Sequence, residues 1–269
     1  MRRVAAAVFG VLALAAVAGL ARAQGADSST KDSDPHTAEP ERPTITTPAS
    51  TVAPGWVELE TGVERDRLDG AHTFFTPTVL KVGVRERVQL DFIGSFQHLS
   101  GATPSYSGIG DVSVAVKWRA LEKAAVLGDF AVQPSLKFPT GSAAHGTGTG
   151  TTDVELLLIS SHDWGAYALD INAAYTRRSG DGSEAPKNAT LWTVSCGGPV
   201  YSFLGWVAEF YGYPRTTGAA GEDGIVAFLT GPTVQIEKWI MLDAGVIVPL
   251  TGAQPHALYA GLTWNIGKL

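Results

Sequence analysis

The residue types that could carry out catalysis or bind a metal are six histidines, one cysteine and many serines, threonines and carboxylates. A hydrolase needs a Ser or Thr nucleophile beside a His base that a third group orients. No HxH or HxxxH spacing suits a metal site. Five histidines are expected in or beside loops: His72, His98, His145, His162 and His256. We predict that the chain is not an enzyme and uses no metal or cofactor.

Charged side chains recur on one face of alternating segments, where they would line an interior. The candidates for a lumen or substrate path are Glu58, Glu60, Arg87, Asp91, Asp111, Lys117, Arg119, Asp129, Lys137, Asp170, Glu209 and Asp243. Both signs occur, and buried charges must be paired or hydrated. Two interpretations remain open. The charges either form a salt-bridged filling that keeps the interior shut or line a selective pore.

The elements that must position these charges are strands, because from Trp56 onward the sequence alternates apolar and polar residues with period two. In the clearest case Val112, Val114, Val116 and Trp118 share one face, and Lys117 lies on the other. We predict twelve strands, at about 56–64, 73–83, 87–96, 109–119, 128–138, 152–161, 165–176, 190–197, 202–213, 224–233, 237–248 and 257–267.

The connections alternate in length along the chain. The odd ones are long and rich in turn residues, including Gln97–Gly108, Pro139–Thr151, Arg177–Ala189 and Pro214–Asp223. The even ones are mostly short. This alternation is typical of an up-and-down barrel in an outer membrane, and only closure satisfies every backbone group in lipid. We predict an all-β transmembrane antiparallel barrel over residues 54–269, with the run Gly146–Gly150 in a mobile extracellular loop.

Aromatic residues near the strand ends could form interfacial girdles or belong to an ordinary core. They are Trp56, Trp118, Phe138, Trp164, Trp206, Tyr213, Trp239 and Trp264. Barrels of this kind usually end in an aromatic residue that the barrel-assembly machinery reads. This chain ends in Leu269, whose parity requires either that the last strand stops before Gly267 or that a bulge shifts it.

The first 53 residues differ from the rest. Arg2 and Arg3 precede an apolar run that ends in Ala21-Arg22-Ala23, which indicates a signal peptide over residues 1–23 rather than a membrane anchor. Residues 24–53 are polar, with Ile45 and Val52 as their only large aliphatic side chains. We expect a flexible polar tail there, with a plug domain as the alternative. The net charge of -6 argues against nucleic-acid binding.

Three segments resemble one family of bacterial outer-membrane proteins. They are Pro54–Gly62, the stretch Gly108–Arg119 with its Gly-x-Gly-Asp opening, and Lys137–Gly141 with its Pro-Thr-Gly. Together they resemble the MetA-pathway of phenol degradation family, over about residues 54–269. The resemblance implies an exported barrel in the bacterial outer membrane, often called a transporter and linked by name to aromatic compounds.

The expected function is passive passage of small solutes, aromatic or apolar ones among them, through a narrow charged lumen. A twelve-stranded barrel lies between filled eight-stranded barrels and open porins, so the path should be narrow or gated. The expected partners are the lipid bilayer, a small-molecule solute and the barrel-assembly machinery. The alternative is a non-transporting structural or partner-binding barrel, and an outer-membrane enzyme is the third option.

Overall fold

The computed structural model describes residues 34–101, 105–180, 186–214 and 224–269, so the expected signal peptide and residues 24–33 lie outside the described residues. The described residues form thirteen strands and one short 3₁₀ helix. The strands are β1 (Trp56–Leu68), β2 (Ala71–Arg85), β3 (Val88–Ser100), β4 (Tyr106–Ile109), β5 (Val112–Ala124), β6 (Gly128–Phe138), β7 (Asp153–Trp164), β8 (Tyr167–Arg178), β9 (Asn188–Tyr201), β10 (Leu204–Tyr213), β11 (Ile225–Glu237), β12 (Ile240–Thr251) and β13 (His256–Lys268), and the helix is η1 (Ala143–His145).

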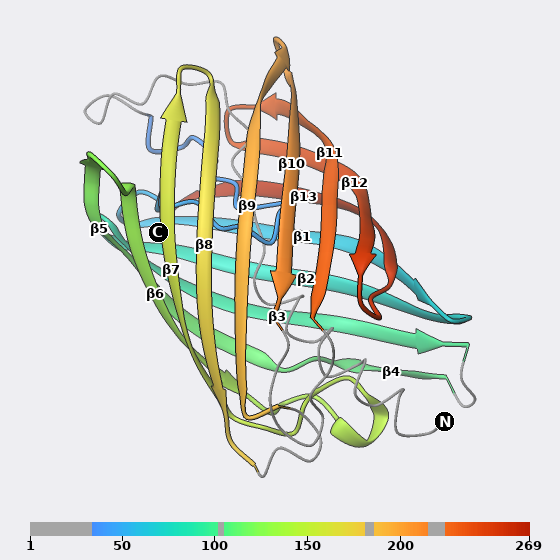
Figure 1. The fold of residues 1–269 in the computed structure, drawn as a ribbon. Coiled ribbons are helices and arrows are strands. Elements are labelled where there is room, and N and C mark those ends of the chain that lie inside the picture. Colours follow the sequence, from blue (N-terminus) through green and yellow to red (C-terminus); the bar gives the residue numbers. More distant parts are fainter. Residues whose placement is uncertain (1–33, 102–104, 181–185, 215–223) are drawn as a thin grey trace.

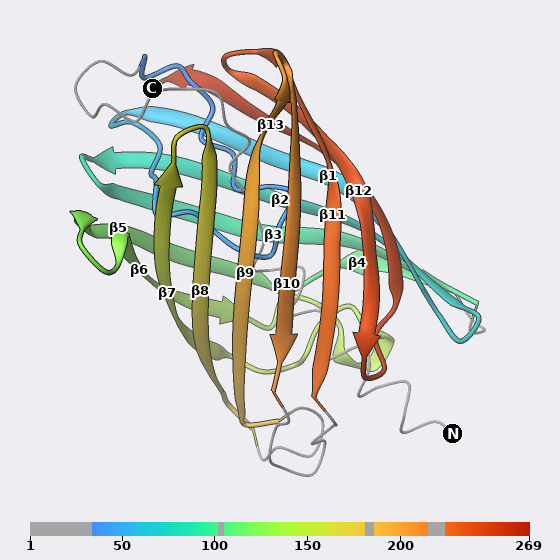
Figure 2. The same ribbon diagram turned by 45° about the horizontal axis from the view of Figure 1, so that its top comes forward.

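The strands form one closed antiparallel barrel (Figures 1 and 2). Neighbours along the chain pair with one another, and β1 pairs with β13 to close the ring. β4 and β5 both pair with β3 and are separated only by Gly110 and Asp111. They therefore act as one interrupted strand, and the twelve-stranded barrel predicted from the sequence is confirmed.

The barrel wall is apolar outside and polar inside over most of its circumference. Trp118, Phe92 and Leu258 are exposed on the outer surface, whereas Lys117, Asp91 and Ser113 are buried on the inner one. This is the arrangement that lipid outside and a polar lumen inside require. Among the expected girdle residues, Tyr213 is buried, and Trp56 and Trp239 are half-buried and contact the ring of His36.

The connections keep the expected alternation with two exceptions, both among those expected to be long. Only residues 69–70 join β1 to β2, and only residues 252–255 join β12 to β13. At the other end of the chain β13 continues to Lys268, and the register between β1 and β13 shifts beside Val57 and Glu58. A bulge therefore shifts the last strand, which is one of the two outcomes that the parity of Leu269 allowed.

Within the described residues, no helix is long and apolar enough to cross a membrane.

Residues 34–53, here called the inner segment, lie within the barrel, although the sequence predicts a flexible tail. The inner segment forms neither helix nor strand, yet Ile45, Ala49 and Val52 are buried. The expectation was wrong for these residues because it counted only their own apolar side chains. The barrel wall supplies polar partners that a free tail would lack, so a polar segment can be ordered there.

The inner wall has two different sectors. Buried charges concentrate on β1, β2, β3, β5 and β6, which form the polar sector. On β7 to β13 many inward positions are instead apolar or aromatic, and we call these residues the apolar wall: Leu157, Ile159, Leu191, Tyr211, Tyr213, Ile225, Leu229, Ile247 and Tyr259. The alternation alone predicts polar residues on the inward face throughout.

Candidate functional site: an occupied lumen

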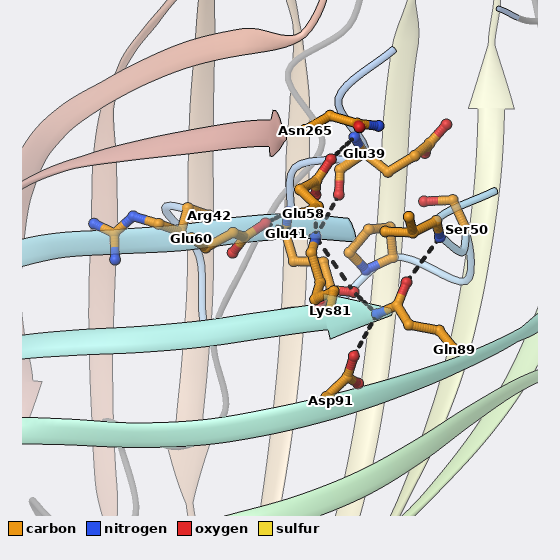
Figure 3. A network of polar contacts seen from close by, with 12 residues as sticks. Glu39, Glu41, Arg42, Ser50, Glu58, Glu60, Lys81, Gln89, Asp91 and Asn265 are labelled. Atoms are coloured by element: carbon orange, nitrogen blue, oxygen red, sulfur yellow. Dashed lines mark hydrogen bonds and ion pairs between the residues drawn. The ribbon is translucent and has the colours of Figure 1, made fainter. Parts of the chain in front are cut away.

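The centre of the polar sector is Lys81 of β2, whose side chain is fully buried. Its Nζ lies 2.5 Å from Glu58 Oε1 and 2.7 Å from Glu60 Oε1, both on β1. Lys81 also donates a hydrogen bond of 2.7 Å to the backbone carbonyl of Glu39 in the inner segment. Because Lys81 and Glu58 are directly opposed on adjacent strands, the wall presents a preformed charge cluster to the segment (Figure 3).

Glu41 is the residue of the inner segment whose negative charge lies beside this cluster. Its carboxylate accepts hydrogen bonds from Lys117 Nζ of β5 and, at 2.9 Å, from Gln89 Nε2 of β3. Lys81 Nζ lies 3.8 Å from the same carboxylate. Burial would raise the pKa of Glu41, but Lys117 and Lys81 outweigh it and hold that pKa below its usual range. Glu41 is therefore an anionic anchor between two lysines.

Further hydrogen bonds in the polar sector connect the neighbours of Glu41 to other wall residues and to the inner segment. Gln89 Nε2 also donates to Asp91 Oδ1 at 2.7 Å, and Gln133 Nε2 of β6 donates to Asp91 Oδ2 at 2.7 Å. Lys117 Nζ contacts the backbone carbonyls of Pro48 and Ser50 at 3.2 Å each. Figure 3 shows Gln89 between Asp91 and the inner segment. The expected lumen charges thus bind a part of the chain itself.

Inward side chains of the barrel wall also accept hydrogen bonds from the backbone amides of the inner segment. The amides of Ile45 and Thr46 donate to the two carboxylate oxygens of Glu209 at 2.7 and 2.8 Å. The amide of Ala49 donates to Ser161 Oγ at 2.8 Å, and that of Val52 donates to Gln89 Oε1 at 2.8 Å. A buried backbone without secondary structure needs such acceptors. The barrel wall supplies them from strands on opposite sides of the lumen.

Arg42 anchors the inner segment to another part of the barrel wall, at β12. Its Nε and Nη2 donate to the two carboxylate oxygens of Asp243 on β12, at 3.0 and 3.1 Å. The side chain lies against Gly62 of β1 and Gly261 of β13, which face each other across the strands. A Cβ on Gly261 would come 2.2 Å from Arg42 Nε. Two facing glycines therefore leave the space in which the guanidinium reaches Asp243.

The periplasmic end of the inner segment is fixed by an aromatic stack. The ring of His36 lies parallel to Trp239, with centroids 5.0 Å apart, and contacts Trp56 at 4.9 Å. Asn265 Nδ2 donates to the carbonyls of Pro35 and Thr37. Beyond it, Asp34 and Lys238 form an exposed ion pair, which adds little stability in water.

A second network lies at the extracellular mouth, around Asp111 and the loop 139–152. Asp111 accepts hydrogen bonds from Gly141 N at 3.1 Å, from Thr149 N and Oγ1 at 2.9 Å each, and from Lys137 Nζ at 2.9 Å. Lys137 also pairs with Asp153 at 2.9 Å. The Gly-Thr run was expected to be mobile, but Thr147 and Thr149 are buried here. These contacts fix the loop to Asp111 and Lys137 at the mouth.

Most of the expected lumen residues do line the interior. The structure places nine of them buried on the inner face: Glu58, Glu60, Asp91, Asp111, Lys117, Lys137, Asp170, Glu209 and Asp243. They do not form one site, because Asp111 and Lys137 belong to the mouth network and Asp170 accepts a hydrogen bond of 2.5 Å from Ser161 Oγ.

Three expected lumen residues are less buried and lie at or near the turns at the periplasmic end of the barrel. Arg87 occupies the turn between β2 and β3 with φ 64°, and its side chain is 44% exposed and bound to Glu122. Arg119 and Asp129 lie toward the turn between β5 and β6, where their side chains approach to 3.7 Å. The expected strand 87–96 began one residue too early, which put Arg87 on a strand face that it does not occupy.

The residues of the lumen network that were missed from the sequence include Glu41, Arg42, Lys81 and Gln89. The alternation of β2 and β3 could have identified Lys81 and Gln89, because each shares its parity with buried residues of the same strand. Glu41 and Arg42 gave no such signal, since their segment has no periodicity. Among the described residues, no group of three His, Cys, Asp or Glu side chains could hold a metal ion.

The sequence matches one family model, "Putative MetA-pathway of phenol degradation", over residues 41–264. The chain belongs to this family. The match begins at Glu41, so the family pattern includes part of the inner segment as well as nearly the whole barrel. No curated protein matches this chain by sequence.

Solved outer-membrane barrels share the fold of this family member. The COG4313 outer membrane channel from Pseudomonas putida F1 aligns with a TM-score of 0.61 and 13% identity, covering 80% of this chain and 97% of the channel. The NanC porin aligns with a TM-score of 0.52 and 12% identity, covering 78% of this chain and all of the porin. The chain thus has the fold of an outer-membrane β-barrel.

Proposed function

We propose that this protein is an outer-membrane channel for small solutes, aromatic or apolar compounds among them, and that solute passes when the inner segment moves within the lumen. The observation that carries the proposal is that side-chain contacts, rather than strand pairing, hold a segment without secondary structure inside a barrel of channel type. Such contacts can be broken without opening the barrel wall.

The apolar wall supports apolar solutes as the cargo. Ile45 and Ala49 of the inner segment pack in one cluster with wall residues that include Leu157, Tyr211 and Leu229. Displacing the segment exposes this surface to water, at a cost of about 25 cal/mol per Å² of apolar area. A solute that covers the same surface removes that cost. An apolar or aromatic molecule is therefore the kind of solute that favours the displaced state.

The polar sector gives the closed state its stability. Breaking one buried ion pair by removing a partner costs about 3–5 kcal/mol, and Glu41 and Arg42 each form such a pair with the wall. At rest the segment should therefore occupy the lumen most of the time. The channel would conduct ions weakly in this state, and the loop 139–152 would narrow the mouth further.

The filled lumen equally favours one other function. A barrel whose inner charges are fully engaged by its own chain can serve as a non-transporting envelope protein or bind a partner through its loops. In that case the lumen network only stabilises the barrel. The two functions predict different responses to removal of the inner segment and to an apolar solute.

The test uses outer-membrane vesicles that contain the wild-type chain or a variant lacking residues 36–49. Uptake of an apolar fluorescent probe, 1-N-phenylnaphthylamine, is compared with vesicles lacking the protein, and ion conductance is recorded in planar bilayers. We expect wild-type vesicles to take up the probe faster than empty ones, with small ion currents, and the variant to conduct ions readily. Probe uptake equal to that of empty vesicles for both proteins would support the non-transporting function instead.

A further inference from the structure

The outer surface of the barrel carries two neighbouring arginines near the extracellular rim, on β1. Arg65 and Arg67 point away from the lumen, because Glu64 and Asp66 have the inward parity, and both arginine side chains are exposed. Neither forms an ion pair or hydrogen bond through its guanidinium within the described residues. Side chains two apart on one strand face are neighbours, so the two guanidinium groups form a single cationic patch.

The residues that pair with the two arginines on the adjacent strands form two distinct rows. Arg67 lies directly between His256 of β13 and His72 of β2. Arg65, closer to the membrane, lies between Leu258 of β13 and Phe74 of β2, which are 59% and 45% exposed. The patch therefore combines a polar rim with an apolar surface directly beneath it. Directly opposed residues have Cβ atoms about 4.5–5.5 Å apart, so each row is continuous.

The position of the patch in the bilayer follows from strand geometry. Trp56 marks the periplasmic end of β1, and Arg67 lies eleven residues further along the strand. With a rise of about 3.3 Å per residue and a tilt of about 40°, this separation spans about 28 Å along the membrane normal. The apolar band of such barrels is about 25 Å tall. Arg65 and Arg67 therefore lie where the hydrocarbon of the outer leaflet meets its headgroups.

We propose that this face of β13, β1 and β2 binds the phosphorylated lipid A anchor of lipopolysaccharide, the glycolipid of the outer leaflet. Guanidinium groups bind phosphate oxygens in a bidentate manner, and the acyl chains would lie along Leu258, Phe74 and Val63. Charge complementarity identifies the ligand, since the patch is cationic and the adjacent carboxylates, Glu64 and Asp66, have the inward parity. Asp69 lies beyond the patch, in the hairpin turn.

The site does not depend on the lumen, so it is independent of the proposed transport function. It would fix the β1–β2 hairpin, and with it the seam where the first and last strands close the barrel. A lipid held at that seam would stabilise closure from outside, whereas the inner segment contacts the same strands from inside through Arg42.

The experiment measures lipid A binding to the full-length protein in detergent by native mass spectrometry. We expect the R65Q/R67Q variant to bind diphosphorylated lipid A about tenfold or more weakly than wild type, because charge-assisted bonds to phosphate are lost. The matched control is Arg177→Gln, since Arg177 is also exposed and outward near the extracellular end of β8 but donates to Asn188. It should keep wild-type affinity.

The ligand provides a second comparison that needs no variant. Wild-type protein should bind dephosphorylated lipid A much more weakly than the diphosphorylated form, and inorganic phosphate at about 10 mM should not displace the lipid. Heat-modifiable migration in gels reports whether each barrel is folded. Unchanged binding by the folded R65Q/R67Q variant, equal binding of both lipids, or full displacement by inorganic phosphate would each overturn the proposal.

Discussion

Replacing Glu41 with glutamine tests whether charge holds the inner segment in the lumen. The substitution keeps the shape of the side chain and an acceptor oxygen for Lys117, but removes the negative charge that lies between Lys117 and Lys81. Lys117 would then keep only neutral acceptors from the inner segment, including the carbonyls of Pro48 and Ser50 at 3.2 Å. The lysine charge would remain buried without its anionic partner on the inner segment.

The size of the effect follows from the burial of the pair. Removing one partner of a buried pair costs about 3–5 kcal/mol, and the amide oxygen that remains places the expected value near the lower limit, at about 3 kcal/mol. Each 1.4 kcal/mol changes an equilibrium about tenfold. The fraction of time that the segment spends displaced should therefore rise about 100-fold in the E41Q variant, while the barrel wall stays intact.

Single-channel recording in planar bilayers measures this change as an increase in the open fraction. The matched control is Lys238→Gln, which breaks the exposed pair with Asp34 at the other end of the same segment and should change the open fraction less than about fivefold. An open fraction in E41Q equal to that of wild type, with a folded barrel, would refute the reasoning. Equal opening in both variants would show that any disturbance of the segment suffices.

Three further predictions concern the same networks. The G261V variant should destabilise the folded protein by about 1–3 kcal/mol, because the added side chain overlaps Arg42. This loss of stability should vanish in a chain without residues 36–49. Heat-modifiable migration in gels measures the stability of each variant. The D111N variant should increase proteolytic cleavage of the loop 139–152, since Asp111 accepts hydrogen bonds from Thr149 and Gly141 there; an unchanged cleavage rate would contradict this role. The lowered pKa of Glu41 means that its anchoring is complete above its ordinary pKa of 4.5 and is lost as the pH falls through the lowered value. Wild-type conductance should therefore rise only below about pH 4.5, and this component should be absent in E41Q.

The strands could be predicted from the sequence because each one carries its own signal. Alternation assigns the outward face without any knowledge of neighbours, as in Val114, Val116 and Trp118, which all face outward in the structure. The lengths of the connections then indicated an up-and-down order. The sheet must also close into a barrel, because an open sheet edge in lipid would leave backbone groups without hydrogen-bond partners. These arguments also placed nine of the twelve lumen candidates on the inner face.

The contents of the barrel could not be predicted in the same way. The inner segment has no periodic pattern, and its polar composition is typical of disorder when the segment is considered alone. Its order depends on Glu209, Gln89 and Asp243, which come from strands far apart in the sequence. Arg42 and Asp243, for example, are separated by 201 positions.

The sequence by itself determined a membrane barrel, its strand number and the face that each strand turns to lipid, because a repeat of two residues is a local property of the chain. Only the tertiary structure decided that the lumen charges bind residues 34–53 and that Asp111 holds the loop 139–152 at the mouth. The physical reason is that a side-chain partnership is set by distances in space. Closure of the ring brings those positions together, and no local pattern records which of them will meet.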